Sequence, residues 1–162
     1  MIRNEEENLY KILKFLDINY IRHEHEAIYT IEESKNLNIE IEGQQCKNLF
    51  LKNKKGDKHY LVILDEDSRV NLKELAKKMG VNSLSFASEE RLEKYLGVKK
   101  GSVTPFGLIN DINKEVIVLI DKNLNKEGLI NFHPNINTAT ISISYLDFEK
   151  FLKYQRNESM LI

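Results

Sequence analysis

A cysteine beside a lysine is the first pair of residues in the sequence that could do chemistry. Cys46 could act as a nucleophile, and the positive charge of Lys47 could lower the pKa of its thiol. Neighbours on a β-strand point to opposite faces, however, so adjacency does not bring the two groups together. We interpret Cys46 as a buried structural thiol and keep a cysteine hydrolase as an alternative.

Two histidines form the second candidate site. His23 and His25 would share one face of a strand and could chelate a metal ion, with Glu24 and Glu26 on the opposite face. No third ligand with metal-site spacing joins them. The sequence also has no Gly-x-Ser-x-Gly elbow and no glycine-rich phosphate loop. We therefore predict neither a metal site nor a cofactor.

The remaining polar candidates stand at the ends of expected elements. They are Thr30, Lys47, Asn48, the loop Gly101–Pro105 and His133. Each also has a purely structural explanation: a helix cap, a solvated charge, a strand edge, a turn conformation and a hydrogen bond to a carbonyl, in that order. From the residues alone, the set indicates no more than a polar cleft in an α+β domain.

Hydrophobic periodicity predicts interspersed helices and strands with no repeat and no linker. Helices are expected at 5–16, from the cap Thr30 to about 36–38, and at 71–79, 88–97 and 146–154; strands are expected at 20–23, 47–52, 59–65, 83–86, 116–121 and 138–144. A Lys-Gly-Asp turn between the second and third strands indicates a hairpin, and the polar segment 131–134 reads as a connection. We predict one α+β domain over residues 1–162. Its mixed, mostly antiparallel sheet would be barrel-like and flanked by helices.

Composition indicates a small cytoplasmic protein. The chain is 41% hydrophobic and 30% charged, with a net charge of −1 and a single cysteine, which excludes an internal disulfide. No apolar run approaches the roughly 20 residues of a membrane helix, so no membrane partner is expected. The stretch 47–58 carries five lysines against one acid, which indicates either a solvated hairpin face or a surface for phosphates.

Four segments occur in the order typical of one family of editing proteins. They are 25–33 (His-Glu-Ala-Ile-Tyr-Thr-Ile-Glu-Glu), 47–51 (Lys-Asn-Leu-Phe-Leu), 101–105 (Gly-Ser-Val-Thr-Pro) and 132–134 (Phe-His-Pro), with Asn-Thr-Ala-Thr at 137–140. Together they resemble the YbaK/ProX family, the trans-editing relatives of the insertion domain in bacterial prolyl-tRNA synthetase. The Lys-Asn and Phe-His-Pro segments resemble the alanine-specific ProX/PrdX-like branch, since the cysteine-specific branch usually has Lys-Thr-Leu. One departure is His25-Glu26, where the family commonly has His-Pro.

The resemblance implies a role for each matched position. Lys47 and Asn48 would hold the scissile ester and the terminal adenosine, and Lys47 would stabilise the developing negative charge. His133 would line the pocket for the amino-acid side chain. Thr30 and the loop residues Gly101, Ser102, Val103, Thr104 and Pro105 would bind the aminoacyl group. Lys52, Lys54 and Lys55 would then contact tRNA phosphates.

The implied reaction is hydrolysis of alanyl-tRNA(Pro) by a positioned water, without a metal ion or a covalent intermediate. A synthetase cannot strongly exclude alanine from its proline pocket, so a second site hydrolyses what is small enough to enter it. Mischarged tRNA(Pro) is the implied partner, and prolyl-tRNA synthetase is a further one. The alternatives are another mischarged tRNA such as cysteinyl-tRNA(Pro), and a non-catalytic module that binds tRNA or an amino acid.

Overall fold

A long hairpin forms the centre of the fold. In the computed structural model, which describes residues 2–27, 30, 32–33 and 40–162, β2 (Gln44–Asn53) pairs with β3 (His59–Asp65). The turn closes on Asn53, whose Oδ1 accepts hydrogen bonds from the backbone N–H groups of residues 56, 57 and 58. These bonds replace ladder bonds that the turn cannot make, and they fix the register of the two strands. The predicted hairpin is confirmed, with β2 beginning three residues earlier than expected.

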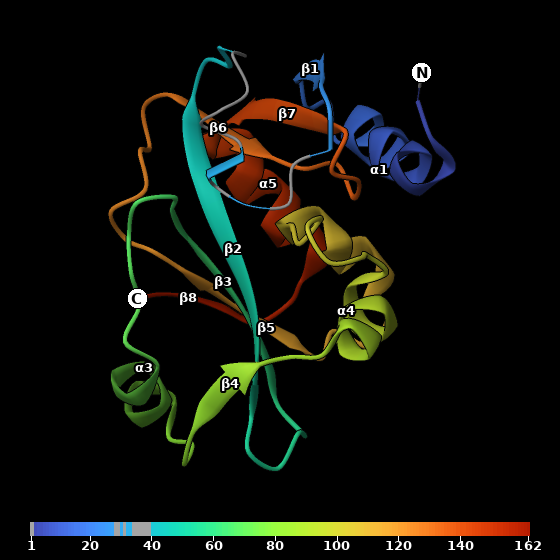
Figure 1. Ribbon diagram of the computed structural model, residues 1–162. Coiled ribbons are helices and arrows are strands. Elements are labelled where there is room, and N and C mark those ends of the chain that lie inside the picture. The colour runs from blue at the N-terminus through green and yellow to red at the C-terminus, as the bar shows by residue number, and fades with distance from the viewer. Residues whose placement is uncertain (1, 28–29, 31, 34–39) are drawn as a thin grey trace.

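The described strands form one open, mixed sheet (Figure 1). Its order is β1-β7-β6-β2-β3-β5-β8, and β4 pairs with β2. The remaining strands are β1 (Ile21–Glu24), β4 (Leu84–Phe86), β5 (Val116–Ile120), β6 (Leu129–Phe132), β7 (Ala139–Ser144) and β8 (Ser159–Leu161). Parallel pairs join β2 to β6, β3 to β5 and β5 to β8, whereas the other pairs are antiparallel.

The α+β class and the mixed sheet are as predicted, but the barrel is wrong. Closure would require the two end strands, β1 and β8, to pair, and they lie at opposite ends of the strand order. Two strands were also missed. The polar segment 131–134 contains the last two residues of β6, and the C-terminal tail contains β8. Runs of three or four residues give too little alternation to recognise.

The helices begin and end at residues that suit their caps. They are α1 (Asn4–Phe15), α3 (Leu72–Met79), α4 (Glu89–Leu96) and α5 (Tyr145–Gln155), with a 3₁₀ helix, η1, at Pro105–Asn110. Asn71 and Ser88 cap α3 and α4, and both helices end at a glycine in the left-handed conformation. Most of the helix expected after Thr30 lies outside the described residues.

Two hydrophobic cores lie on the two faces of the hairpin. The first, larger core joins Phe50 and Leu61 to α1, α4, η1 and α5. The second joins Leu51 and Tyr60 to α3. Figure 1 shows α3 apart from the other helices. Because neighbouring residues of β2 and β3 enter different cores, the side-chain alternation of the hairpin decides which face each polar residue occupies.

A buried ion pair attaches α1 to the first strand. Glu6 is fully buried and accepts hydrogen bonds from Arg22 at 2.9 and 3.1 Å, from the hydroxyl of Tyr10 and from the backbone of Arg3. Burial alone would raise the pKa of Glu6, but the bonds from Arg22 and Tyr10 outweigh it and hold the pKa below its usual value. Glu6 is therefore charged and fully paired in the folded state.

Replacement Glu6→Gln is expected to lower the free energy of unfolding by about 3 kcal/mol, because it leaves the guanidinium without its partner. The wild-type carboxylate contributes fully above its unfolded pKa near 4.5, and the contribution is lost as the pH falls through the lower folded value. Denaturant titration at pH 7 and at pH 4 measures both effects. Exposed Glu7→Gln is the control, and equal stability of the two variants at pH 7 would contradict the prediction.

Candidate active site

Lys47 lies near the start of the central strand. It is opposite Leu64 in the β2–β3 ladder and therefore shares a face with Leu49 and the second core. Its ammonium group donates a hydrogen bond to the backbone carbonyl of Ser68, in the connection from β3 to α3. A carbonyl oxygen orients the lysine without cancelling its charge, so the cation remains available to an anionic group.

The same face of the sheet is polar where β6 and β7 meet the start of β2. Asn131 is opposite Gln45 of β2 and Ser142 of β7, and Thr140 is opposite His23 of β1. The intervening residues of β6 and β7 point into the first core, namely Ile130, Phe132, Ile141 and Ile143. Alternation thus separates an apolar face from a polar one that contains Lys47. We call residues Gln45, Lys47, Asn131, His133, Thr140 and Ser142 the polar face.

His133 extends the polar face just beyond β6 and is held in one tautomer. Its Nδ1 lies 2.9 Å from the carbonyl oxygen of Ala139, which only accepts, so Nδ1 carries the proton and Nε2 is an acceptor. Burial lowers the pKa of His133, and nearby His25, with ring centroids 6.1 Å apart, lowers it further. His133 is therefore a neutral imidazole at physiological pH.

His25 is held by its own neighbours. Its Nδ1 lies 2.7 Å from the carbonyl oxygen of Glu26, and its Nε2 lies 2.8 Å from the hydroxyl of Thr140. The first contact makes Nδ1 a donor, and the hydroxyl of Thr140 is the hydrogen-bond partner of Nε2. Both nitrogens of His25 are thus occupied. The described residues contain no group of three or more side chains suited to a metal ion.

Asn48 and the 101–105 loop lie on the opposite side of the sheet from Lys47. Asn48 faces Ile63 across the ladder, on the side of Phe50 and the first core, where its Oδ1 is buried without a hydrogen-bond partner. In the loop, Gly101 has a φ of 87°, and Thr104 accepts from the backbone of Phe106 to begin η1. Val103 packs against the same first core, and Ser102, Thr104 and Pro105 are buried.

The strand pairing along one edge of β2 is interrupted, and we call this interval the gap. Along one edge of β2, β6 pairs with residues 44 and 45, and β4 pairs with residues 51 to 53. Between them, the described part of the chain contributes one backbone hydrogen bond to this edge, from Ala87 to Phe50. Lys47 and Asn48 both lie in this interval.

Two other sets of predicted residues lie apart from the polar face. Lys54 and Lys55 are exposed at the hairpin tip, and Lys52, near the end of β2, is half-buried. His59 is buried, and burial lowers its pKa. The positive charges of Arg91, Lys94 and Lys52 add to this effect, so that the pKa of His59 is about 4. Thr30 is exposed, and its hydroxyl accepts from the backbone of Glu33, as expected for a helix cap.

The structure argues against Cys46 as a nucleophile. Burial, with the nearby carboxylates of Asp65 and Glu66, raises the pKa of the Cys46 thiol to about 12. The thiol lies on the side of the first core, opposite to Lys47, and its Sγ is 3.8 Å from the carbonyl oxygen of Gln44. Cys46 is therefore a protonated, structural thiol, as the sequence analysis predicted.

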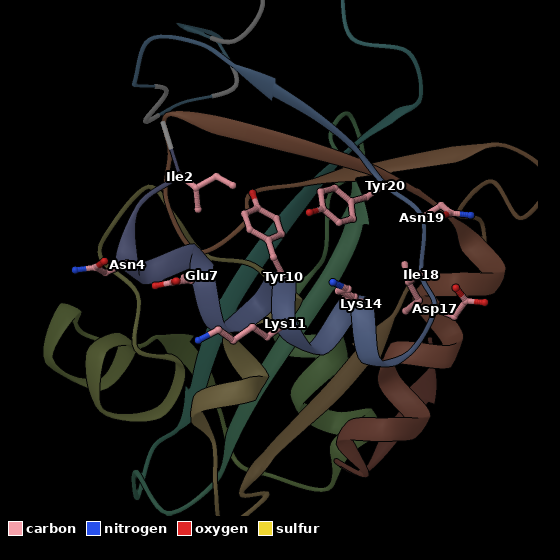
Figure 2. Close-up of a pocket in the computed structure, with 10 residues that line it drawn as sticks. All are labelled: Ile2, Asn4, Glu7, Tyr10, Lys11, Lys14, Asp17, Ile18, Asn19 and Tyr20. Atoms are coloured by element: carbon pink, nitrogen blue, oxygen red, sulfur yellow. The ribbon is translucent and has the colours of Figure 1, made fainter.

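A cavity lies elsewhere, between α1 and the segment that enters β1 (Figure 2). Its volume is about 680 Å³, and Tyr10 and Tyr20 stack beside it with ring centroids 5.0 Å apart. Lys11, Lys14 and Asp17 lie at its rim, so its charge is mixed. No residue of the polar face lines this cavity.

Comparison with known proteins identifies the family of this chain. Residues 25–151 match the model of the aminoacyl-tRNA editing domain. The chain belongs to this family. It is 49% identical over 142 residues to the prolyl-tRNA editing protein ProX of Acetoanaerobium sticklandii, an alignment that spans 88% of this chain and 87% of that protein.

Two further relatives extend the comparison. A prolyl-tRNA synthetase associated domain-containing protein 1 of Xenopus laevis is 34% identical over 160 residues, spanning 96% of this chain and 95% of that one. A crystal structure of a candidate trans-editing enzyme for prolyl-tRNA synthetase superimposes with a TM-score of 0.70 at 16% identity, covering 99% and 97% of the two chains. That last likeness establishes the fold alone. As a member of the editing family, the chain is an aminoacyl-tRNA deacylase.

The sequence analysis missed four residues of the polar face. Gln45, Asn131, Thr140 and Ser142 gave no recognised signal; Gln45 precedes the strand expected at 47–52, and Asn131 lies in a strand that was not predicted. The alternation Thr-Ala-Thr-Ile-Ser-Ile-Ser at 138–144 did carry the information, since every second residue is a small hydroxyl. Because alternate residues of a strand lie on one face, this alternation predicts a polar face of small hydroxyl side chains.

The raised pKa gives a test of Cys46. We expect iodoacetamide at pH 7.5 to leave Cys46 of the folded editing domain unmodified, because alkylation requires the thiolate. Mass spectrometry of the intact protein measures the modification, and the same reaction in guanidinium chloride is the positive control. Cys46→Ala should retain deacylase activity. Rapid alkylation of the folded protein together with loss of activity would support a cysteine hydrolase instead.

Proposed function

We propose that this editing domain acts in trans on tRNA(Pro) and hydrolyses alanine mischarged onto it. The observation that carries the proposal is the placement of Lys47 and neutral His133 on one polar face beside the gap in β2. The name of the relative from Acetoanaerobium sticklandii supports the tRNA, and the Lys-Asn and Phe-His-Pro segments support alanine.

Lys47 stabilises the transition state. An aminoacyl ester is already activated, so attack by water needs mainly a group that favours the negative charge on the carbonyl oxygen. The ammonium group of Lys47 reaches the ester by exchanging its hydrogen bond to the carbonyl of Ser68 for one to the developing oxyanion. The flexible lysine chain makes this exchange without movement of the strand.

His133 places the alanine side chain and the water. Its Nε2 accepts a hydrogen bond from water, because Nδ1 is committed to the carbonyl of Ala139. Asn48 and the backbone of Gly101–Pro105 reach the substrate from the other side of the gap. Asn48 then binds the terminal adenosine, and the loop encloses the aminoacyl group. Thr30 is a further residue proposed to border the cleft.

Exclusion of proline follows from size. A pocket that fits a methyl side chain has no space for the pyrrolidine ring, so correctly charged tRNA is spared. The synthetase errs in the opposite direction, because its larger pocket admits alanine. Editing by a separate protein requires the mischarged tRNA to leave or to be handed over, and prolyl-tRNA synthetase is the proposed partner for that step. Both proteins would work in the cytoplasm.

Two alternatives make different predictions. Cysteine is close to alanine in size, so the same hydrolysis could act on cysteinyl-tRNA(Pro). A non-catalytic binding module would retain affinity for tRNA without releasing any amino acid. Comparison of three esters separates these possibilities.

Deacylation of alanyl-, cysteinyl- and prolyl-tRNA(Pro) tests the proposed function directly. We expect rapid release of alanine only, with little effect of EDTA, and a loss of at least about a hundredfold in kcat/KM for Lys47→Ala. Lys47→Arg should retain more activity than Lys47→Ala, because it keeps the charge. Lys77→Ala, on exposed α3, is the control. Preferred release of cysteine would favour the first alternative, and survival of all three esters would favour a binding module.

Lys52, Lys54 and Lys55, the hairpin lysines, are the proposed contacts to tRNA phosphates. They lie toward the opposite end of β2 from Lys47. The seven residue steps from Lys47 to Lys54 span roughly 23 Å of extended chain. An acceptor stem whose 3′ end enters the gap would pass over the hairpin tip, where Lys54 and Lys55 are exposed and Lys55 has only a long contact, 3.7 Å, to Asp57. These lysines are therefore free to bind phosphate oxygens.

The double variant Lys54→Glu/Lys55→Glu should weaken tRNA binding and reduce the slope of log K against log salt by about 2, one for each lost phosphate contact. Filter binding at several salt concentrations measures both quantities. The matched control is Lys11→Glu/Lys14→Glu on α1, which Figure 1 shows far from the hairpin tip. Identical slopes for the two double variants would exclude the hairpin as the tRNA contact.

A further inference from the structure

Asn131 is buried in a way that hydrogen bonding within the described protein does not explain. Its side chain is 2% exposed, and neither its Oδ1 nor its Nδ2 has a hydrogen-bond partner. Buried Asn157 is different, because its Nδ2 donates at 2.8 Å to Asp111 and at 2.8 Å to the carbonyl of Val116. A buried carboxamide without partners destabilises the folded state, and leucine has nearly the same shape without that cost. Asparagine at this position therefore calls for another explanation.

The position of Asn131 indicates what that explanation is. It precedes His133 by two residues on β6, and Gln45, its neighbour on β2, precedes Lys47 by two residues. Because β2 and β6 run parallel, Lys47 and His133 lie on the same side of Asn131 and on the same face. The carboxamide thus belongs to the same face as Lys47 and His133, the two groups proposed to act on the ester, and precedes each of them by one side-chain repeat of the strands.

A short exposed segment covers the carboxamide. A Cβ on Gly43 would come within 2.7 Å of Asn131 Oδ1, so the backbone of Gly43 lies against it. Glu42 is fixed next to it by a hydrogen bond of 3.3 Å from Ser142 to its carbonyl oxygen. Both Glu42 and Gly43 are exposed, so the cover on this side is thin.

We propose that Asn131 is a substrate-binding residue that holds the α-amino group of the aminoacyl ester, an assignment that rests on the proposed deacylase function. A neutral primary amine has N–H donors and one lone pair, which match Oδ1 and Nδ2 of a carboxamide. The polar face suits the neutral form, because it contains the cation Lys47 and no Asp or Glu. An α-amino group has an ordinary pKa of about 8, so deprotonation near neutral pH costs little.

This contact also contributes to selectivity. The nitrogen of proline is part of its ring, so a proline amine bound to Asn131 would carry an additional ring carbon to a place where the backbone of Gly43 already packs closely against Oδ1. Alanine presents a bare amine to the same place. Rejection of proline therefore arises at the amine as well as at the side chain.

The variant Asn131→Leu separates binding from structure. We expect its Tm to equal or exceed that of wild type, because an unpaired polar group is removed, while kcat/KM for alanyl-tRNA(Pro) falls about tenfold or more. Asn157→Leu is the control, and it should lower Tm because it breaks two hydrogen bonds. Wild-type kcat/KM in a folded Asn131→Leu variant would overturn the proposal.

A substrate without the amine tests the assigned contact. For propionyl-tRNA(Pro), which has hydrogen in place of the amino group, wild type and Asn131→Leu should give kcat/KM values within about twofold, because the lost contact is absent from both. An equal fall on both esters would overturn the assignment to the amine. Asn131→Ala gives the same comparison if the leucine variant does not fold. If wild type hydrolysed no ester of tRNA(Pro), the proposed function would fail instead.

Discussion

Everything at the candidate site depends on the register of β2. The strand lies between β3 on one edge and β6 with β4 on the other, and its residues point alternately to two different environments. A shift of one residue would put Lys47 among the side chains of the first core and Phe50 on the other face. Asn53 prevents such a shift, because its three hydrogen bonds define the turn and hence the pairing of β2 with β3. A single polar side chain at the far end of the hairpin thus determines on which face Lys47 lies.

The electrostatics of the polar face depend on the uncharged hydrogen-bond partners of Lys47 and His133. Lys47 is bound by a carbonyl oxygen, and His133 donates to another, so neither is paired with a carboxylate. A carboxylate beside Lys47 would reduce the field that favours an oxyanion, and one beside His133 would favour its protonation. The buried ion pair of Glu6 and Arg22 shows the opposite arrangement, where full pairing serves to attach a helix. Structural charges are paired in this protein, and the lysine of the site keeps its charge for the substrate.

The sequence predicted the helices and long strands well because their alternation extends over many residues and their caps are recognisable. It failed for β6 and β8, whose three or four residues take their stability from neighbouring strands rather than from any local pattern. The site shows the same division. Lys47 and His133 could be singled out by resemblance, and strand alternation alone separates Asn48 from Lys47. The unpaired amide of Asn131, by contrast, depends on contacts between segments about 85 residues apart. Such contacts have no local signature.

Cys46 and Lys47 show why neighbours in sequence have opposite chemistry here. The pleat sends the thiol into the first core, where burial keeps it protonated, and sends the ammonium group to the polar face, where it stays charged. An activated thiolate would require the two groups to share a face. Because they do not, Cys46 is not available as an activated thiolate on the face of Lys47, which supports the proposed attack by water. An ester that is already reactive needs mainly stabilisation of the developing charge, and a lysine on this face suits that proposed role.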